Sequence, residues 1–563
     1  MNHSRWNLKP AVPDGHPLNT AGLSHLLAQL LYNRSLTDPS QLELFITADK
    51  RLSGDPFLMP DMHQAVARIY RAMLSGEKIA VYGDFDADGI TATALLVQGL
   101  NILNNTAIPY IPHRLTEGHG LKTAALEKLY QEGITLVITV DCGITGVSEV
   151  KKAKRKGLDI VITDHHTPLA EIPPAVAVVN PRLAGSKYPF SELAGVGVAL
   201  KLLQALFRSL GRDQEPDELL DLVALGTVAD IMPLLGENRY LVKQGLRLIN
   251  STSRPGLREM LALAGLSPGN LDTESITWTI APRLNAAGRL EHAITSYRLL
   301  MTDSPQEAYE LAAWLETNNT ERQRLTTRVF SMAREQILAQ GISPLLIARD
   351  KDYPSGIAGL VAGRLCEEFY RPAIVVREGE KISSGSCRSI PEFDIIQALN
   401  QFSSLFTQFG GHPRAAGFTM PTKNLPRLQE HLSRLATTQL EKIDLRPGMD
   451  IDAEVTLPEL GGDTFRTIQQ LAPFGEGNTA PAFLSRRVEV MDCRTMGGNG
   501  EHLRMKLKQG GTIWNGVGFR LGNNETRTPS TLDIVYNLEI DRWGGEERLR
   551  LNILDFATSN EII

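Results

Sequence analysis

The chain has 563 residues, of which 42% are apolar and 22% charged, and its formal net charge at pH 7 is −6. This length predicts about three or four domains, and this composition excludes a disordered, collagen-like or low-complexity protein. The small negative net charge argues against nucleic-acid binding through overall charge, so any such site must come from local basic patches.

No apolar run reaches the roughly 18 residues that a membrane span needs, and the first residues lack the apolar segment of a signal peptide. The four cysteines are far apart and have neither a disulfide-framework nor a zinc-site spacing. We therefore expect a cytoplasmic protein with no membrane partner.

Residues 1–57 contain short helical patterns and are expected to form a lead-in that packs on the next domain. Apolar, β-rich runs then alternate with helix-length segments, and the runs are 78–85, 107–114, 135–142, 159–166 and 175–180. Continuous apolar strands that alternate with helices predict a doubly wound parallel sheet. We assign this first α/β domain to residues 58–303.

The segment Ser304-Pro305-Gln306-Glu307 offers an N-cap, a proline at the first helical position and a capping-box glutamate. It predicts one or two long connecting helices over 304–340. Residues 341–444 form a second α/β unit, with strands at 343–350 and 371–378. Residues 445–563 form a third domain, whose short, turn-punctuated strands predict a small β-barrel.

Metal-binding side chains follow the ends of four apolar segments in the first domain. The motifs are GDFDADG (83–89), VDCG (140–143), TDHH (163–166) and TVAD (227–230), of which the last ends a helix. Because the carboxyl ends of parallel strands meet at one edge of a sheet, we expect these motifs to converge. Aspartate oxygens with one imidazole suit Mn²⁺ or Mg²⁺ better than Zn²⁺.

Five carboxylates in one cleft would repel one another unless cations neutralise them. Two divalent ions about 3.5–4 Å apart do so in many enzymes that displace groups at phosphorus. Taken alone, each motif also fits a surface turn, and only their joint occurrence favours a metal site. A calcium loop is excluded because Leu95, not a glutamate, stands six residues after Gly89.

Together these motifs resemble those of the DHH phosphoesterase superfamily. Further segments resemble one branch of it, the bacterial exonucleases specific for single strands; they are 111–121, 193–202, 281–290, 385–390, 409–418 and 471–478. The resemblance covers about residues 50–555. It implies a DHH catalytic domain, a DHHA1-like substrate-binding domain and a C-terminal barrel like an oligonucleotide-binding (OB) fold.

The resemblance implies that two Mn²⁺ or Mg²⁺ ions are held by Asp86, Asp88, Asp141, His165 and Asp230, with Asp141 as the bridging ligand. It adds Asp84 to the catalytic set for orienting water, and His166 either for supporting a metal ligand or for contacting phosphate. It also implies Asp164 as a residue that orients a histidine. Three places depart from the family. Tyr353-Pro354 stands where Trp-His is common, His119 where Tyr is common and Ser186 where Cys is common, so the roles of those residues are not carried over.

Basic and small residues in glycine-rich turns are candidate DNA contacts because backbone N–H groups can approach phosphate there. The candidates in such turns are Ser386, Arg388 and His412. Arg114, Arg283, Asn285 and Arg289 are further candidates because they lie in segments that resemble the family. A structural ion pair is the alternative for each arginine. For Ser386 and Arg388 the resemblance favours a contact to the 5′-end phosphate.

The expected barrel carries a local basic patch. Seven basic and three acidic residues lie between Leu484 and Arg520, together with Trp514 and Phe519. Phosphate attraction and base stacking are how OB folds hold single strands. The alternative is that the two aromatic rings fill the barrel core, and for Phe519 the sequence favours this alternative at least as much as a DNA contact.

These observations predict a metal-dependent exonuclease that degrades single-stranded DNA from the 5′ end to mononucleotides. One alternative is a phosphodiesterase of short oligonucleotides or cyclic dinucleotides, although such enzymes resemble only the first two domains. A second is an inactive single-strand-binding replication scaffold, but such relatives lose metal ligands that are present here. The resemblance also implies a helicase and a single-strand-binding protein as partners, and we expect a monomer.

Overall fold

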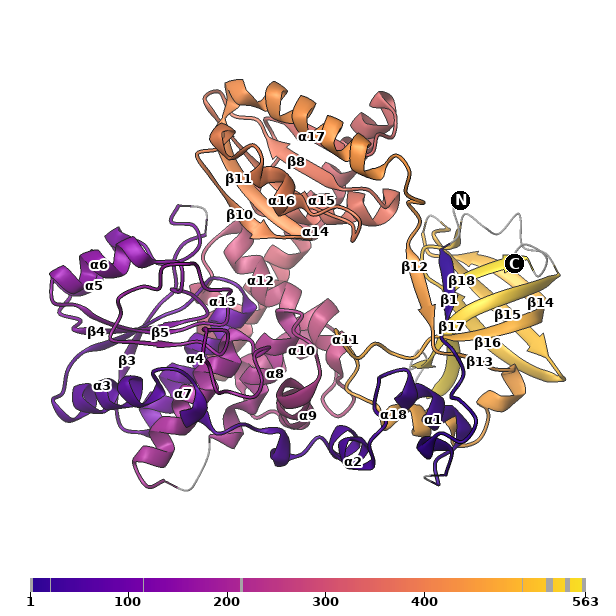
Figure 1. Ribbon diagram of the computed structural model, residues 1–563, viewed down its shortest axis with the longest axis horizontal. Helices are drawn as coiled ribbons and strands as arrows, with labels where there is room; N and C mark the ends of the chain where they lie inside the picture. Colours follow the sequence, from indigo (N-terminus) through magenta and orange to yellow (C-terminus); the bar gives the residue numbers. More distant parts are fainter. Residues whose placement is uncertain are drawn as a thin grey trace. The chain divides into compact units, whose positions relative to one another are not determined.

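The computed structural model describes residues 4–20, 22–114, 116–212, 216–498, 500–522, 530–541 and 547–558. Its contacts divide the chain into two compact units (Figure 1). The sheet unit comprises Gly54–Met232 and Leu241–Leu445. The barrel unit comprises Met1–Ser53, Pro233–Tyr240 and Arg446–Ile563.

The first domain of the sheet unit contains a five-stranded parallel sheet in the order β3-β2-β4-β5-β6. The strands are β2 (Ile79–Tyr82), β3 (Ala107–Tyr110), β4 (Leu136–Val140), β5 (Asp159–Thr163) and β6 (Ala177–Val179). Every residue of β2 and β4 is buried, as expected where helices cover both faces of a parallel sheet. The predicted doubly wound sheet is confirmed. Its strand order reverses between β2 and β4, which is where open sheets bind ligands.

Helices lie on both faces of this sheet (Figure 1). One face carries α5 and α6, and the other carries α3, α4 and α7. Their bounds are α3 (Met62–Leu74), α4 (Ala87–Ile102), α5 (Thr123–Gln131), α6 (Val147–Arg155) and α7 (Gly195–Ser209). Helix α4 is buried almost throughout because it packs against both α7 and α8.

A group of helices follows the sheet in the chain. It contains α8 (Leu220–Ala229), α9 (Gly236–Asn250), α10 (Pro255–Leu263), α11 (Thr273–Ser275), a π-helix (Ile276–Ile280), α12 (Ala281–Leu290) and α13 (Ile294–Met301). The connection predicted over 304–340 is a single helix, α14 (Pro305–Gln340). The Ser304 hydroxyl caps it by accepting a hydrogen bond from the Glu307 N–H at 3.3 Å. Helix α14 packs on α10, α12 and α13 and then on α15 and β7.

The second domain of the sheet unit has a mixed five-stranded sheet in the order β10-β11-β9-β8-β7. Its elements are β7 (Leu346–Asp350), α15 (Ser355–Phe369), β8 (Ala373–Arg377), β9 (Ile382–Arg388), α16 (Ile395–Asn400), β10 (Gln408–His412), β11 (Ala415–Pro421) and α17 (Leu425–Leu440). Tyr353 is buried in the core between α14 and α15, and Pro354 is the N-cap of α15. Both residues therefore have structural places at this departure from the family pattern.

The barrel unit is built on strands β13 (Ala453–Glu454), β14 (Phe483–Met496), β15 (His502–Gln509), β16 (Thr512–Gly518), β17 (Thr531–Asp541) and β18 (Arg548–Thr558). The barrel closes because β14 pairs with both β15 and β17, and this confirms the predicted C-terminal barrel. The N-terminal helices α1 (His25–Tyr32) and α2 (Pro39–Thr47) share its apolar core, and β1 (Arg5–Leu8) pairs with β12 (Gly448–Ile451). The N-terminal segment thus groups with the barrel, and not with the domain that follows it in the chain.

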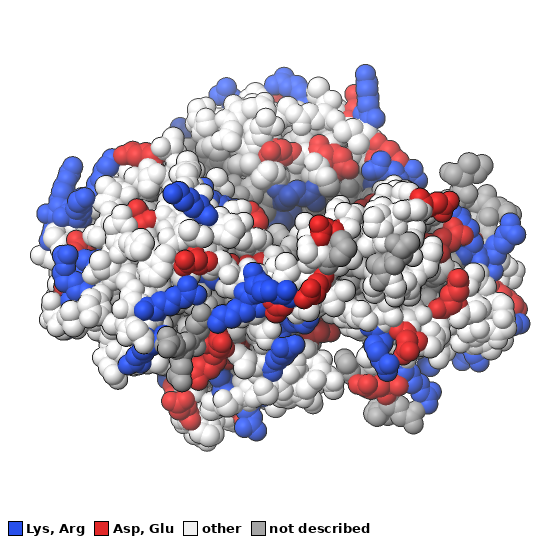
Figure 2. All heavy atoms as spheres, turned by 60° about the horizontal axis from the view of Figure 1, so that its bottom comes forward, with Lys and Arg blue, Asp and Glu red and all other residues white. Residues whose placement is uncertain are grey.

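The charged side chains are distributed without a dominant sign. Figure 2 shows blue basic and red acidic residues interspersed over much of the face in view. Within the described residues, no helix is long and apolar enough to cross a membrane. Any attraction for nucleic acid must therefore come from local clusters, as the net charge of −6 suggested.

Candidate metal and phosphate site

The four predicted motifs converge at one edge of the parallel sheet. Three groups of side chains there have possible ligand atoms within 4.8 Å of one another; they are Asp84, Asp86 and Asp141; Asp88, His165 and Asp230; and Asp141, His165 and His166. We call the five aspartates together with His165 the carboxylate cluster. It lies where β2, β4 and β5 end, on both sides of the reversal in strand order.

Asp141 occupies the centre of the cluster because β4 ends in a tight turn. Its φ of 59° is in the left-handed region, which a short polar side chain tolerates better than most. A Cβ atom at Gly195 would lie 2.5 Å from Asp141 Oδ1, so only glycine leaves room for this carboxylate. Asp141 is 3% exposed.

Backbone N–H groups orient two further carboxylates. The N–H groups of Gly195 and Val196, at the start of α7, donate to Asp88 at 2.7 and 2.9 Å. Asp86 Oδ1 accepts from the first turn of α4, at 3.1 Å from Asp88 N and 3.2 Å from Gly89 N. Both carboxylates face helix N-termini, whose partial positive charge stabilises anions.

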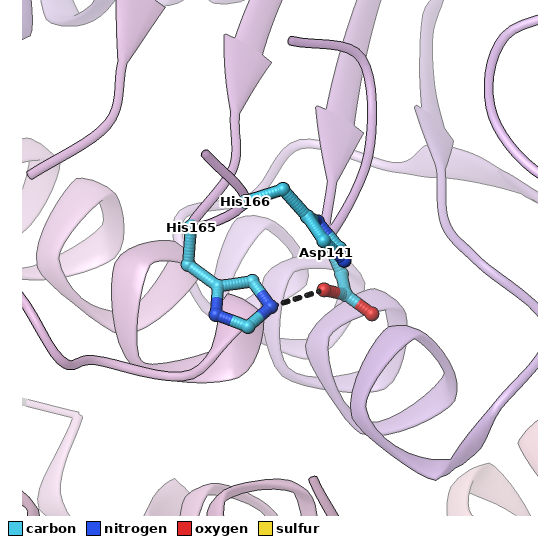
Figure 3. Close-up of side chains that lie close together, drawn as sticks. All are labelled: Asp141, His165 and His166. Atoms are coloured by element: carbon cyan, nitrogen blue, oxygen red, sulfur yellow. Dashed lines mark ion pairs between the residues drawn. The ribbon is translucent and has the colours of Figure 1, made fainter. Parts of the chain in front are cut away.

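The two histidines have different environments. His165 Nε2 lies 3.1 Å from Asp141 Oδ1, 3.6 Å from Asp230 Oδ2 and 3.9 Å from Asp88 Oδ2. Figure 3 shows its ring facing the Asp141 carboxylate. His166 Nδ1 instead lies 2.7 Å from Asp164 Oδ1, and Asp164 also accepts from the N–H groups of His165 and Ile144. Asp164 therefore orients the histidine pair from behind.

Electrostatics separate these histidines further. Burial, reinforced by the charge of His166, lowers the pKa of His165 to about 3. Burial opposes protonation of His166, but its hydrogen bond to Asp164 and the Asp164 charge raise the pKa to about 9. At neutral pH, His165 is thus a neutral imidazole and His166 a cation.

The aspartates repel one another in the absence of a cation. Burial and the neighbouring Asp86 charge raise the pKa of Asp88 to about 7. Burial and the charge of Asp88 raise the pKa values of Asp141 and Asp230 well above the ordinary range. A buried group of this kind either takes up protons or binds cations.

The donor set fits divalent metal ions. Asp84 Oδ1, Asp141 Oδ1 and His165 Nδ1 are buried and have no hydrogen-bond partner among the described residues, and the 3.1 Å approach of His165 to Asp141 lacks hydrogen-bond geometry. Carboxylate oxygens with one neutral imidazole are ligands that Mn²⁺ and Mg²⁺ accept. The structure brings all five predicted ligands together, with Asp84 beside them, where its Oδ2 lies 3.2 Å from His119 Nδ1.

Four arginines form a second charged group, which we call the guanidinium cluster. Burial and the charges of the other three members lower the pKa of Arg289 to about 9; the other members are Arg114, Arg322 and Arg388. None of the four is in an ion pair with any residue that the structure describes, and Arg322 Nε is buried without a hydrogen-bond partner. Burial lowers the pKa of Arg114, and the nearby charges of Asp86 and Asp84 oppose this effect. The Arg114 guanidinium lies 4.9 Å from the centre of the Phe85 ring. The two clusters are therefore neighbours.

Helix α15 makes room for this cluster. Arg289 donates from Nη1 to the Gly356 carbonyl at 3.2 Å, and a Cβ atom at Gly359 would lie 3.2 Å from Arg388 Nη2. Arg388 itself donates only to its neighbouring carbonyl, that of Cys387, at 2.8 Å. Larger residues on this helix face would displace the guanidinium groups.

Ser386 and Arg388 share one face of β9 because side chains two residues apart point the same way. Across the sheet, Arg388 of β9 is in register with Ala415 of β11 and His412 of β10, and Ser386 is in register with Gly417 and Gly410. The two glycines beside Ser386 have no side chains, and a Cβ atom at Gly410 would meet nothing within 4 Å. Ser386 therefore lies beside an open strip of sheet, with His412 on the same face as Arg388.

Two other predicted DNA contacts have structural partners. Arg283 forms an ion pair with Glu316 of α14 at 2.5 Å and donates to the Thr279 carbonyl at 2.9 Å. Asn285 Oδ1 accepts from Ala87 N at 2.9 Å and thereby joins α12 to the start of α4. For Arg283 the structure shows the ion pair that was the alternative reading.

The predicted basic patch on the barrel is partly neutralised. Arg486 forms ion pairs with Glu454 and Asp533, Arg494 with Asp492, and Lys508 with Glu489. Arg504 and Lys506 point outward from β15 and form no ion pair with the residues that the structure describes. Trp514 is half-buried, donates from Nε1 to the Leu457 carbonyl at 3.2 Å and lines a pocket with Ile513 and Asn515. Phe519 is 47% exposed, so of the two readings left open for this ring the core reading does not hold.

Sequence reasoning missed several members of the site. Arg322 lies in α14, which the sequence presents as a connecting helix, and nothing in its sequence surroundings marks it as part of a site. In the structure it donates to Asn319 Oδ1 at 2.8 Å. The backbone donors at Gly195 and Val196 carry no side-chain signal at all. They become visible only when α7 is placed against the carboxylates.

Family models match the three folded parts. The DHH family N-terminal domain matches residues 78–227, the DHHA1 domain matches 342–438 and the RecJ OB domain matches 451–555. The fold and the carboxylate cluster thus define a DHH phosphoesterase with a DHHA1 domain and an OB barrel.

Full-length relatives narrow this class. The single-stranded-DNA-specific exonuclease RecJ of Bacillus subtilis is 38% identical over 562 residues, which cover 99% of this chain and 71% of that protein. Its namesake from Escherichia coli is 31% identical, over 95% of this chain and 96% of that protein. The crystal structure of RecJ from Thermus thermophilus with Mn²⁺ superposes with a TM-score of 0.85 at 30% identity, over 98% of this chain and 79% of that one. The chain belongs to the RecJ family.

Proposed function

We propose that this chain is a metal-dependent exonuclease that hydrolyses single-stranded DNA from the 5′ end and releases 5′-mononucleotides, in DNA repair and recombination. The observation that carries the proposal is the pair of neighbouring clusters, one of carboxylates and one of unpaired arginines. A phosphodiester needs metal ligands at the reacting phosphorus and cations at the other phosphates. The activity named for the RecJ relatives supports the substrate.

Asp86, Asp88, Asp141, His165 and Asp230 would hold the metal, and we propose two ions of Mn²⁺ or Mg²⁺. Solved RecJ structures with Mn²⁺ and with Mg²⁺ support this choice of metals. When bound, such ions supply a water of lowered pKa and neutralise charge on the phosphoryl oxygens. Asp141 and His165 each take part in two of the three groups of ligand atoms, and of the two only Asp141 offers two oxygens, so we propose that Asp141 would be shared by the two ions.

The surrounding residues would hold this constellation ready for reaction. The Gly195 and Val196 N–H groups fix the Asp88 carboxylate, and the α4 N-terminus fixes Asp86. Asp164 keeps His166 protonated, so this cation can donate to a phosphoryl oxygen. Asp84, with an unpartnered oxygen, can accept a hydrogen bond from water.

The guanidinium cluster would bind backbone phosphates, with Arg388 and Ser386 at the 5′-terminal one. The open strip of sheet beside Ser386 leaves space for a strand end. Arg114 is the member of the guanidinium cluster that lies near Asp84 and Asp86, and it would contact the phosphate next to the scissile bond. His412 lies on the same sheet face as Arg388 and would bind further along.

The outward cations Arg504 and Lys506 on β15 would hold the more distant part of the strand by phosphate attraction. Trp514 would contribute at most an edge of its ring, because its indole N–H is already engaged. The proposal keeps a helicase and a single-strand-binding protein as partners, a monomeric state and a cytoplasmic location as predictions.

The test follows a long single strand labelled at its 3′ end during incubation with Mn²⁺. The proposal expects products that shorten from the 5′ end over time, together with released mononucleotides. The Asp141→Ala variant should leave the strand intact but still bind it. Chelation of the metal should have the same effect as the substitution.

Two other outcomes would replace the proposal. Turnover of dinucleotides alone, with long strands untouched, would indicate a short-substrate phosphodiesterase. Strand binding without any cleavage, and without metal binding by calorimetry, would indicate a scaffold. Shortening from the 3′ end would refute the proposed polarity alone.

A further inference from the structure

Trp278 is 75% exposed, more than any other large apolar side chain that the structure describes. A tryptophan buries about 150–250 Å² when it packs, so this exposure forgoes a large hydrophobic stabilisation. The ring is nevertheless held on a rigid support, because Ile276 and Ile280 on either side of it are 0% and 1% exposed. A folded element thus presents Trp278 to the outside.

The support is a π-helical segment, Ile276–Ile280, which leads without a break into α12. The wider turn of a π-helix changes the direction of its side chains relative to the following α-helix, and such segments are frequent at functional sites. Hydrogen bonds fix both ends. Thr277 Oγ1 donates to the Thr273 carbonyl at 2.9 Å, and Arg283 donates to the Thr279 carbonyl at 2.9 Å.

The same helix connects Trp278 to the carboxylate cluster. Asn285, seven residues further on, accepts from Ala87 N between the ligands Asp86 and Asp88. Seven residues of helix span about 10 Å along its axis. Consecutive bases of a stacked strand are about 3.4 Å apart, so Trp278 lies roughly three nucleotides from the metal site along this axis.

Arginines connect this helix to the guanidinium cluster. Besides burial, the charge of Arg283 on α12 lowers the pKa of Arg322 on α14, and the charge of Arg322 lowers that of Arg289. Since Arg283 is neutralised by Glu316, the unpaired positive charge begins at Arg322 and continues to Arg289. Base stacking on an aromatic face, combined with phosphate attraction by cations elsewhere on the path, holds single-stranded nucleic acid without reading its sequence.

We infer that Trp278 is a stacking platform for a base of the single strand, about three nucleotides from the scissile phosphodiester. The inference rests on the proposed function for its substrate. It assigns to Trp278 a role in substrate grip and none in chemistry. Substrates too short to reach the ring gain nothing from it, whereas longer strands bind more tightly.

The test compares full-length Trp278→Ala and Trp278→Phe with the wild type on a series of single strands from two to twenty nucleotides, with Mn²⁺. We expect Trp278→Ala to raise KM about tenfold for the longer strands, with kcat and dinucleotide turnover unchanged. Trp278→Phe keeps a stacking face and should stay within about threefold of the wild type. Tyr130→Ala is the matched control, because Tyr130 is also an exposed aromatic on a helix of the sheet unit.

A second measurement does not depend on catalysis. Single-stranded DNA added in the presence of a chelator should quench tryptophan fluorescence more in the wild type than in Trp278→Phe. Equal quenching in the two proteins overturns the inference, as does an unchanged KM for long strands, which would leave the ring free for a protein partner. An equal rise in KM for dinucleotides overturns it in favour of a structural role. If the wild type degrades no strand at all, the proposed function fails, and the quenching alone decides the role of Trp278.

Discussion

The carboxylate cluster and the guanidinium cluster are both crowded groups of like charge in the same unit, but they relieve their repulsion differently. The aspartates can take up protons, and the pKa of Asp88 is raised to about 7. Arginine side chains hold their protons far more firmly; even the lowered pKa of Arg289, about 9, leaves it charged at neutral pH. The first cluster can therefore exist uncharged without a ligand, whereas the second needs an anion.

This difference has a consequence for stability and function. Each cluster lowers the stability of the ligand-free fold because like charges are held together away from water. Metal ions at one cluster and phosphate at the other would remove that repulsion. Neutralising substitutions should therefore stabilise the free protein while they reduce the proposed activity.

The largest effect should come from the centre of the carboxylate cluster. Asp141→Asn keeps the shape of the side chain but removes a charge that two groups of ligand atoms share. We expect at least a 1,000-fold loss of nuclease rate with Mn²⁺. Asp159→Asn is the control, since Asp159 forms an ion pair with Arg68 at 2.6 Å and lies at the opposite end of β5. Retention of more than a tenth of the rate in Asp141→Asn would contradict the assignment of this ligand.

Arg388→Met tests the other cluster. Loss of a charge-assisted hydrogen bond of about 1.5–3 kcal/mol predicts a KM about 10- to 100-fold higher for 5′-phosphorylated strands. Strands with a 5′-hydroxyl should change much less, and the urea midpoint of the free protein should rise. Arg334→Met, which removes an arginine paired with Glu368 at 2.6 Å, should alter neither KM. A uniform loss on both substrates would assign Arg388 to internal phosphates instead.

The pH dependence of stability should distinguish metal-free from metal-loaded protein. The pKa of Asp88 is raised in the fold above its unfolded value, so the neutral form stabilises the fold. That stability is fully present below the unfolded pKa of about 3.9 and is lost as pH rises through about 7. We expect the urea midpoint in chelator to fall between about pH 4 and pH 7, and the increase on adding Mn²⁺ to grow over that range. A flat profile in chelator would mean that the carboxylates are not mutually repelling.

The smallest effect is expected on the barrel. Lys506→Gln removes an outward cation that forms no ion pair with the described residues. We expect this substitution to weaken binding of long strands about two- to threefold. The slope of log K against log salt should fall by about 0.7, the value for one phosphate contact on a single strand. Lys508→Gln is the matched variant, because Lys508 already pairs with Glu489 at 3.3 Å. Equal effects of the two substitutions would argue against a specific phosphate contact at Lys506.

The sequence alone determined the fold class and indicated which side chains gather at the edge of the parallel sheet. Alternating apolar strands and helices are a local pattern, and a carboxylate at the end of a buried strand must lie at the carboxyl edge of the sheet. The Ser304 cap and the start of α14 likewise depend on neighbours within four residues. For these features short-range chemistry was enough.

Only the tertiary structure decided what surrounds the ligands. Arg322 joins Arg289 across two helices, Gly195 opens space for Asp141 from α7, and Glu316 neutralises Arg283 from α14. It also decided that Phe519 is exposed and that the N-terminal segment groups with the barrel. The reason is physical. Whether an arginine is paired and whether a ring is buried depend on residues far away in the chain, and one sequence without its fold does not reveal those distances.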